Sequence, residues 1–390
     1  MRPFFLTMTS VVSFSLLTGC ATGLVAETRY PTYDVPAAAD TLRVRILYTK
    51  SGARLDATGP YHIQLKMGGK GAEGQEPLRV RTLHGTLVFG HQSFKGDVVA
   101  YPEGASTLIL NGRKYRGVLV FHALAGGRFD VVEYVNMDQY LYGVLPREVE
   151  PNWPLESLKA QAIVSRTFAL SNKLTDTKER FDVSDGVMDQ VYGGMSVESP
   201  ASNRAVDETR GQVLEDSTGK PVQTFFHSSC GGHTELPEHV WRNANAGDAF
   251  GSVSDGFCTE DPHFKWQLTI SYSTIRARLK RVGIRLKDIK KITVVQKTES
   301  GRAEFFGIQT AAGSTEVPGN KFRLALGPEA LRSTLITNMK AGKSSVWFEG
   351  RGWGHGVGLC QWGARGRALA GQTSQQILET YYPRAKLATL

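Results

Sequence analysis

One segment constrains the fold of this chain more than any other: the twenty residues Leu155–Leu174, which contain no Gly and no Pro. Pro154 directly precedes the segment, and proline suits the first turn of a helix because its nitrogen has no hydrogen to leave unpaired. Glu156 lies near the positive end of the expected helix dipole. The apolar residues form one stripe and a border beside it, so we expect a long helix buried at the centre of a domain. The stripe consists of Leu155, Leu158, Ala162 and Ala169, with Ile163, Leu170 and Leu174 beside it.

The residues before this helix follow a different pattern, in which apolar and polar residues alternate. Leu42–Leu47 and Tyr61–Leu65 alternate with a period of two, and turn sequences such as Asn111-Gly112 separate the apolar runs. Such alternation predicts an antiparallel β layer with one buried face. Further apolar runs lie at 86–89, 107–110, 117–122 and 129–135.

The residues after the helix predict a mixture of elements. We expect strands at 221–227 and 291–296, a basic helix at 273–287 and a short final helix at 373–382 that Pro383 ends. The expected fold class is therefore α+β, with an antiparallel β-rich N-terminal part followed by a mixed α+β domain that contains one long central helix.

The first twenty residues have the features of an export signal. Arg2 is the only charged residue among the first 26, and the apolar stretch 4–17 is shorter than the roughly 20 residues of a membrane span. The stretch ends in Leu17-Thr18-Gly19-Cys20, which resembles a bacterial lipobox. We therefore expect a signal peptide at 1–19 and lipidation of Cys20, with a plain signal peptide cleaved at a small residue as the alternative.

Residues 20–40 are rich in Ala and Pro and lack periodicity, so we expect them to tether the lipid to the folded part. The residue after the expected lipidation site is Ala21 and not Asp, which resembles an outer-membrane sorting signal. The expected location is therefore outside the cytoplasm and lipid-anchored, on the periplasmic face of the outer membrane if the host is Gram-negative.

The charge of the chain favours an anionic partner. Lys and Arg number 46 against 37 Asp and Glu, for a formal net charge of +9, and removal of Arg2 with the signal leaves +8. A basic surface attracts anionic polymers, although solvated helix faces or contact with anionic lipid would give the same balance. Nucleic acid is not expected as a partner, because export removes the protein from it.

A compact cluster of metal-ligand residue types follows the central helix. His227, Cys230 and His233 have a His-x2-Cys-x2-His spacing, and Cys258 follows further on. Two His and two Cys are ligands that zinc prefers, so one structural Zn²⁺ is the first hypothesis. A Cys230–Cys258 disulfide, two inert thiols and a Cys–His nucleophile pair remain open as alternatives.

The glycine cluster 350–358 does not fit a nucleotide-binding motif. A dinucleotide fingerprint needs Gly at i, i+2 and i+5, and no start within the cluster meets that spacing. Gly342-Lys343-Ser344 resembles the end of a phosphate-binding loop, but residue 337 is Thr where Gly is required. The cluster instead offers a backbone that a polymer could approach closely, together with the imidazole of His355.

The segment Pro146–Pro151, directly before the central helix, contains a candidate acid. We expect it to be a β-to-α loop, and loops held on a rigid scaffold often carry function. Glu148 lies between the two prolines, and Glu150 is a second carboxylate. A solvated surface carboxylate is the alternative.

Five blocks in order, from about Tyr115 to Tyr382, closely resemble the sporulation stage II protein D family, which also contains the amidase enhancers. The last block is the most specific of the five. The blocks contain Tyr140–Glu148 with Trp153-Pro154, Leu158–Ala162 and Arg166-Thr167, then Gln190–Gly194, Phe226–Gly232, Val240-Trp241, and Gly352–Gly358 with Gln361–Ala364.

The resemblance implies a peptidoglycan lytic transglycosylase that cleaves glycan strands stripped of their stem peptides. It places the catalytic acid on Glu148 and the substrate-binding residues on Gln190, Tyr192, His355, Gln361 and Arg166. It places the zinc of some members on the His227, Cys230, His233 and Cys258 group. One carboxyl suffices for this chemistry, because the 6-hydroxyl of N-acetylmuramic acid attacks its own C1.

Two residues depart from the family pattern. Cys360 stands where Ser is common, and Val149-Glu150 follows Glu148 where Met and a proline are typical. The alternatives to the enzyme are a non-catalytic glycan-binding enhancer of a cell-wall amidase and a structural lipoprotein. The β-rich region is expected at 41–112 and the family domain at 113–390.

Overall fold

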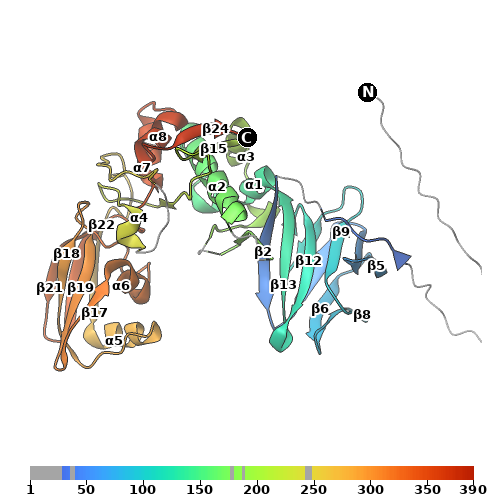
Figure 1. Cartoon of the computed structure of the whole chain (residues 1–390), viewed down its shortest axis with the longest axis horizontal. Coiled ribbons are helices and arrows are strands. Elements are labelled where there is room, and N and C mark those ends of the chain that lie inside the picture. Colours follow the sequence, from blue (N-terminus) through green and yellow to red (C-terminus); the bar gives the residue numbers. More distant parts are fainter. Residues whose placement is uncertain (1–28, 36–39, 176–179, 187–188, 242–247) are drawn as a thin grey trace, which may run out of the picture.

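The structure is a computed structural model that describes residues 29–35, 40–175, 180–186, 189–241 and 248–390. Along its longest axis the molecule has a β-sandwich at one end, a group of helices in the middle and a smaller α+β unit at the other end (Figure 1). We call these parts the sandwich, the helical centre and the outer unit. The expected α+β class, with antiparallel strands first, is confirmed. The expected signal peptide and Cys20 lie outside the described residues.

Two sheets form the sandwich and share one hydrophobic core. The alternation of Leu42–Leu47 is confirmed, because Leu42, Val44 and Ile46 point into this core. Neighbouring strands are antiparallel except β14, which pairs parallel with β2. In spatial order the larger sheet contains β1 (Arg29–Tyr30), β5 (Gly69–Gly74), β4 (Tyr61–Leu65), β9 (Val98–Pro102), β12 (Val118–Leu124), β13 (Arg128–Asn136), β2 (Thr41–Thr49) and β14 (Val183–Ser184). The smaller sheet contains β11 (Arg113–Tyr115), β10 (Leu108–Leu110), β3 (Ala53–Ala57), β6 (Leu78–Leu83), β7 (Thr86–Phe89) and β8 (Gln92–Phe94).

The sandwich continues past residue 112, where we expected the β-rich region to end. Strands β12 and β13 lie in the middle of the larger sheet, between β9 and β2. Val120 of β12 pairs with Val99 on one side and with Val132 on the other. Residues 113–136 therefore belong to the sandwich, and the helical centre begins after Asn136.

Helix α2 (Leu155–Thr175) forms the axis of the helical centre and confirms the predicted buried helix. Leu158 and Ala162 face the core of the sandwich. Ile163 and Val164 face a second core that α2 shares with the C-terminal helices. The other elements of the centre are α1 (Met137–Glu148), α3 (Pro200–Glu208), α4 (Pro237–Val240), α7 (Gln361–Leu369), α8 (Ser374–Tyr381), β15 (Gln212–Glu215), β16 (Phe226–His227), β23 (Leu359–Cys360) and β24 (Lys386–Thr389).

The strand expected at 221–227 forms only at its end, as β16. Pro221 and Val222 pair briefly with β15, and the residues after them bond to single partners in the centre. Thr224 Oγ1, for example, donates to Val164 O of α2 at 2.9 Å. β16 itself pairs parallel with β23, which joins residues 133 positions apart in the chain.

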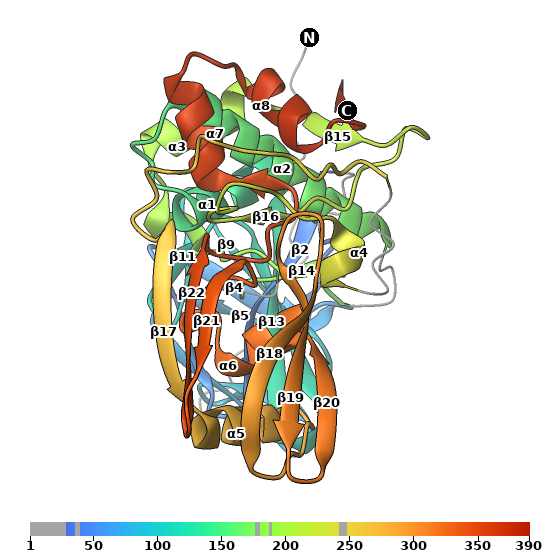
Figure 2. The same cartoon turned by 90° about the vertical axis from the view of Figure 1, so that its left-hand side faces the viewer.

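The outer unit (Lys265–Arg351) packs two helices against two three-stranded sheets (Figure 2). Its first and last strands pair with each other, so the chain enters and leaves the unit at the same place. The predicted basic helix is present as α5 but ends at Arg281, before Gly283, whose φ of +85° leaves the helical region. The unit consists of β17 (Lys265–Ser271), α5 (Tyr272–Arg281), β18 (Ile289–Lys297), β19 (Ala303–Thr310), β20 (Gly313–Pro318), α6 (Gly319–Leu326), β21 (Ile336–Ala341) and β22 (Ser345–Arg351).

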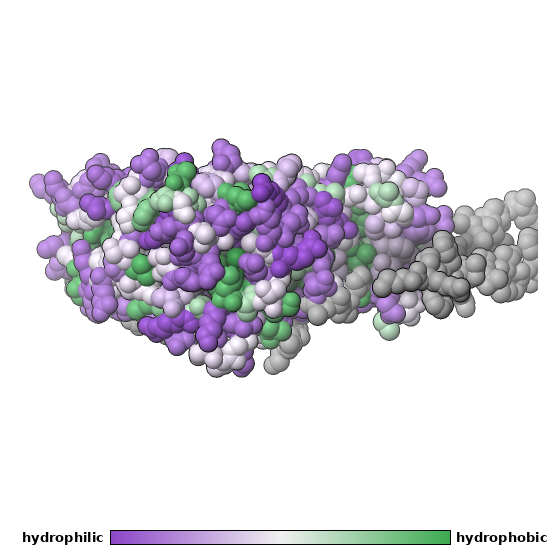
Figure 3. Space-filling model, turned by 90° about the horizontal axis from the view of Figure 1, so that it is seen from above, coloured by the Kyte–Doolittle hydropathy of each residue, from purple (hydrophilic) through white to green (hydrophobic). Residues whose placement is uncertain are grey.

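The surface of the molecule mixes hydrophilic and hydrophobic residues. Seen from above, it shows scattered apolar residues within a mostly hydrophilic face (Figure 3). Among the described helices, none has the length and the apolar character needed to cross a lipid bilayer.

Candidate active site and cysteine cluster

Glu148 is the last residue of α1, and the expectation that it lies in a loop was wrong. Asn136 begins the helix, because its side-chain oxygen accepts a hydrogen bond from Asp138 N at 3.0 Å. The helix runs through Pro146 and ends at Glu148, because the backbone of the next residue, Val149, is extended. Two flanking prolines suggested a loop, but Pro146 lies inside the last helical turn.

The carboxyl group of Glu148 is held by the backbone and largely removed from water. Val191 N donates a hydrogen bond to Glu148 Oε1 at 2.9 Å. Burial raises the pKa of Glu148, and the Val191 amide and the Arg147 guanidinium oppose this shift without cancelling it. Glu150, the second carboxylate of the segment, is exposed. A carboxyl that keeps its proton more readily than usual can serve as a general acid.

Gln190 and Tyr192 hold Val191 in place from both sides. Gln190 Oε1 accepts a hydrogen bond from the Tyr140 hydroxyl at 3.1 Å, and its Nε2 donates to Ser165 O at 3.3 Å. The ring of Tyr192 packs on that of Tyr140 with centroids 5.0 Å apart. Both residues were expected to bind substrate, but their side chains are 0% and 3% exposed. In this structure they position the amide that holds the acid and offer no surface to a polymer.

Two further residues pack closely around Tyr192. A Cβ on Gly143 would lie 2.5 Å from the Tyr192 ring and 2.9 Å from Gly194 O, so only glycine fits there. The carboxyl of Glu133 is fully buried beside Tyr192 and accepts a hydrogen bond from Gly117 N at 3.0 Å. Burial raises the pKa of Glu133 to about 7.

Arg166 and Gln361, also expected to bind substrate, join helices in the centre. Arg166 forms an ion pair with Asp138 at 3.0 Å, in the first turn of α1, whereas Glu148 ends that helix. Gln361 Nε2 donates to Gln161 Oε1 at 3.4 Å, which links α7 to α2. Both side chains are more than nine-tenths buried. The structure therefore gives them polar contacts between helices and does not bring Arg166 to Glu148.

His355 lies in the glycine-rich loop 350–358 as a neutral imidazole. Its Nδ1 accepts a hydrogen bond from Val357 N at 3.0 Å. The ring centroids of Trp241 and His227 lie 5.0 and 5.5 Å from that of His355. Burial lowers the pKa of His355 to about 3, and nearby buried guanidinium groups act in the same direction.

Arg302, directly before β19, links the outer unit to this loop region. The buried guanidinium donates to Cys230 O at 2.6 Å and to His233 O at 2.7 Å. A Cβ on Gly356 would lie 2.5 Å from the guanidinium carbon, so this glycine allows the close approach. The loops around His355 and Cys230 are thus fixed by a side chain from another part of the molecule.

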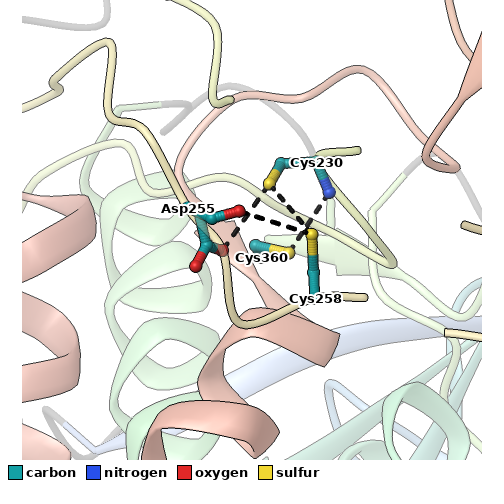
Figure 4. A group of neighbouring side chains, drawn as sticks. All are labelled: Cys230, Asp255, Cys258 and Cys360. Carbon is teal, nitrogen blue, oxygen red and sulfur yellow. Dashed lines mark hydrogen bonds between the residues drawn. The ribbon is translucent and has the colours of Figure 1, made fainter. Parts of the chain in front are cut away.

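Three cysteines and one aspartate converge behind these loops (Figure 4). The ligand atoms of Cys230, Asp255, Cys258 and Cys360 all lie within 4.8 Å of one another, and all four residues are buried. Cys230 Sγ is 3.5 Å from Cys258 Sγ and 3.6 Å from Asp255 Oδ2. Ligand atoms about 2.3 Å from a tetrahedral zinc lie roughly 3.8 Å apart, so this donor set fits the ion.

The residues around the cluster orient its ligands, as second-layer contacts do at metal sites. The Tyr381 hydroxyl donates to Asp255 Oδ2 at 2.7 Å, and Arg367 pairs with Oδ1 at 3.3 Å. Gly363 N donates to Cys360 Sγ at 3.3 Å. The three cysteines are free thiols in the structure.

The structure brings together two of the four expected metal ligands and places the two histidines elsewhere. His227 Nδ1 lies 3.1 Å from Val357 O, and burial lowers the pKa of His227 well below its ordinary value. His233 Nδ1 lies 2.9 Å from Thr234 O. Cys360 and Asp255 take their positions in the cluster. The count of cysteines carries a signal for Cys360, because three remain once Cys20 is set apart and three cannot all pair.

An aromatic contact connects the cluster to the candidate acid. Trp362, two residues after Cys360, meets Trp153 with ring centroids 5.1 Å apart. The Arg365 guanidinium lies 5.2 Å from the Trp362 ring. Trp153 follows Glu148 by five residues, and Trp362 belongs to α7, which begins directly after Cys360. The segment after the acid therefore packs on the helix that follows the cysteine cluster.

Comparison with known proteins agrees with the geometry of this part of the chain. A family profile described as Stage II sporulation protein matches residues 125–215, which include α1, Glu148 and the segment that holds its carboxyl. A profile described as a domain of unknown function (DUF8618) matches residues 233–358.

Three relatives show how far the likeness extends. The chain is 33% identical to an uncharacterized protein of Brachyspira hyodysenteriae, over 70% of this chain and 72% of the relative. It is 29% identical to the amidase enhancer of Bacillus subtilis, over 74% of this chain but only 46% of the relative. It is 27% identical to stage II sporulation protein D of Bacillus subtilis, over 66% of this chain and 76% of the relative.

These matches define the class of protein. The chain belongs to the stage II sporulation protein D and amidase enhancer family. Membership of this family supports a role related to the bacterial cell wall.

Proposed function

We propose that this protein is a lytic transglycosylase that cleaves the bond between N-acetylmuramic acid and N-acetylglucosamine in peptide-stripped glycan strands. One observation carries the proposal: the Glu148 carboxyl is desolvated, its pKa is raised, and its position is set by a single backbone amide. This arrangement favours the protonated form of the acid, which the proposed reaction uses at its start and restores at its end. Export and lipidation at Cys20 are part of the proposal, because the substrate lies outside the cytoplasm.

The proposed reaction needs one carboxyl and no water. Glu148 donates its proton to the 4-oxygen of the leaving N-acetylglucosamine as the bond from that oxygen to C1 breaks. The 6-hydroxyl of the N-acetylmuramic acid then attacks C1 and closes a 1,6-anhydro ring, and its proton passes to the Glu148 carboxylate. The nucleophile is part of the substrate, so it acts at a high effective concentration. The Val191 amide stabilises the carboxylate between the two proton transfers.

We propose that Cys230, Cys258, Cys360 and Asp255 hold one structural Zn²⁺. Thiolates and a carboxylate are ligands that zinc accepts, and bound zinc would supply cross-links between distant segments and no chemistry at Glu148. Metal analysis of the purified protein, with a count of free thiols, tests this proposal. About one zinc per chain would support it. A metal-free protein with a disulfide between Cys230 and Cys258 would overturn it.

A second candidate function is a glycan-binding enhancer of a cell-wall amidase. The likeness to the amidase enhancer of Bacillus subtilis favours it, since that match covers 74% of this chain. An enhancer would need the folded protein and its glycan contacts, but it would not need the Glu148 proton.

One experiment separates the two functions. The protein is incubated with intact and with peptide-stripped peptidoglycan, beside Glu148→Gln, and the soluble products are examined by mass spectrometry. Products ending in 1,6-anhydro-muramic acid from the wild type alone would support the lyase. Reducing ends would indicate a hydrolase. Absence of products together with co-sedimentation of protein and glycan would favour the enhancer.

A further inference from the structure

The positive charge of the chain is concentrated in the outer unit. Residues 265–351 contain seventeen Lys and Arg against six Asp and Glu, a formal charge of +11. The other 303 residues contain twenty-nine Lys and Arg against thirty-one Asp and Glu, a formal charge of −2. The basic character of the whole chain is therefore a property of one structural unit that covers less than a quarter of its length.

The cations of the outer unit are concentrated at α5 and the start of β18. Arg276, Lys280 and Arg285, with Ser273, line a hollow of about 600 Å³. Arg276 pairs with Asp288. The group that we call the basic face consists of the exposed residues Lys280, Arg281, Arg285, Lys287, Lys290 and Lys291.

The basic face is not neutralised by the protein itself. None of its six residues forms an ion pair with another residue in the part of the chain that the structure describes. Elsewhere exposed cations are often paired, as Arg116 is with Glu198 at 2.6 Å and Arg204 with Glu208 at 2.6 Å. Six unpaired cations within twelve residues produce a positive field that extends about 8 Å into physiological salt.

The position of the basic face indicates which anionic partner it meets. Helix α5 and strand β1, where the described chain begins, lie at opposite ends of the long axis (Figure 1). Eight residues lie between Cys20, the expected site of the lipid, and Arg29, and the nine steps from one to the other span at most about 32 Å when the chain is fully extended. Helix α2, with 21 residues, already has about that length. The tether therefore attaches the expected lipid at the sandwich end of the molecule, and the basic face lies in the unit at the other end.

We propose that the outer unit is an anion-binding module whose basic face and adjoining hollow bind the lactyl carboxylates of a peptide-stripped glycan strand. The proposal rests on the proposed function for the identity of this polymer. Removal of each stem peptide exposes one carboxylate per muramic acid, which makes the strand a regularly spaced polyanion. The module binds such a strand at several points and holds it on the protein, while Glu148 acts elsewhere on the same strand.

The test compares two sets of charge changes of equal size. The first is Lys280→Gln, Arg285→Gln, Lys287→Gln and Lys290→Gln together, on the basic face. The matched control is Lys50→Gln, Arg79→Gln, Arg81→Gln and Lys95→Gln, four exposed cations of the sandwich that form no ion pair among the described residues. Both sets are made in the full chain with Cys20→Ser and Glu148→Gln, so that neither lipid nor turnover affects binding. Circular dichroism confirms that both variants are folded.

Binding is measured on peptide-stripped glycan, on chitin oligosaccharides, which have no carboxylate, and on vesicles of anionic phospholipid. We expect the basic-face variant to bind stripped glycan about tenfold more weakly than its parent and the control variant to remain within about twofold. Binding to chitin oligosaccharides should be equal in all three proteins. Equal losses in both variants would show an effect of net charge alone, and preferential loss of vesicle binding would assign the face to lipid; either result overturns the proposal.

The cleavage assay keeps this inference separate from the proposed function. The basic-face changes are placed in a chain with Glu148 intact, and cleavage of short soluble glycan fragments is followed. Glycan binding that depends on the basic face, with no cleavage by any variant, would refute the proposed lyase activity and still support the anion-binding module. Cleavage by the wild type with unchanged glycan binding in the basic-face variant would refute the module alone.

Discussion

The helical centre and the outer unit differ in the exposure of their charged side chains. The centre buries them in defined pairs, as with Arg166 and Asp138 or Arg367 and Asp255. The outer unit leaves most of its seventeen cations at the surface. Buried groups are held in one geometry and are little affected by salt, whereas exposed groups act at a distance and are screened. The comparison suggests chemistry in the centre and attraction of the polymer by the outer unit.

The largest effect should come from the acid of the centre. Glu148→Gln removes the transferable proton but keeps the acceptor for the Val191 amide, so we expect cleavage of stripped glycan to fall about 1,000-fold with the fold retained. Glu150→Gln is the control, and it should stay within a few-fold of wild type because that side chain is exposed. Activity in Glu148→Gln comparable to wild type would show that the catalytic acid is not Glu148.

The next effect concerns the cysteine cluster, which ties the segments of the centre together. Zinc at a thousand times its Kd would stabilise the folded protein by about 4 kcal/mol. Cys360→Ser, or removal of that zinc by a chelator, should therefore lower the free energy of unfolding by about this amount. Thermal unfolding with and without added zinc measures the effect. Cys20→Ser is the control, and it should leave the zinc content and the unfolding temperature unchanged. An unfolding temperature indifferent to zinc in the wild type would contradict the expectation.

A pH effect on stability should follow from Glu133. Its pKa is about 7 in the folded protein and 4.5 for an ordinary Glu, so between these values the folded state binds more protons than the unfolded state. Stability therefore falls as pH rises from 4.5 to about 7, by about 3 kcal/mol in total, and stays lower above pH 7. Urea unfolding of Glu133→Gln at pH 5 and pH 8 should show a smaller loss than wild type. Glu76→Gln, at an exposed position, should follow the wild type.

A smaller effect tests the packing that positions the Val191 amide. Gly143→Ala places a Cβ 2.5 Å from the Tyr192 ring, so we expect a loss of about 2 kcal/mol in stability and a reduced rate of cleavage. Gly186→Ala is a suitable control, because a Cβ there meets no atom within 4 Å. Chemical unfolding and cleavage rates measured side by side would show whether the segment beside Glu148 tolerates displacement.

The smallest expected effect is the different response of the two regions to salt, seen in KM for the outer unit and in kcat for the centre. Raising the salt concentration from 0.1 to 1 M shortens the screening length from about 10 to about 3 Å. KM for stripped glycan should then rise roughly tenfold, which corresponds to about 1.4 kcal/mol, while kcat changes little. A fall in kcat with an unchanged KM would reverse the roles that we assign to the two regions.

The sequence predicted the elements whose pattern depends on local physics. The buried helix was confirmed because apolar residues at helical spacing leave no other stable arrangement for Leu155–Leu174. The alternation at Leu42–Leu47 predicted a strand with a buried face for the same kind of reason. The family blocks pointed to Glu148, whose burial and backbone contact the structure then supplied.

Other features depend on contacts between distant residues and carry little local signal. Cys360 and Asp255 join Cys230 across separations of 130 and 25 residues, so no single compact motif contains the whole ligand set. Gln190 and Tyr192 belong to a family block, but no sequence pattern distinguishes a residue that touches substrate from one that supports the acid from behind. The division of charge between regions is visible in the sequence only after the limits of the outer unit are known.

The insertion of the outer unit between two halves of the centre sets an order of events during synthesis. The chain leaves the centre at Phe264 and returns at Gly352, whose N–H bonds to Phe264 O at 2.8 Å. Synthesis begins at the N-terminus, so the strands of the sandwich exist long before α7 and α8 are made. A nascent chain that ends at residue 351 already contains Glu148 but lacks Cys360 and the helices that cover α2. The centre is therefore completed last, when the thirty-nine residues 352–390 pack over α2, a helix that was synthesised before the whole of the inserted unit.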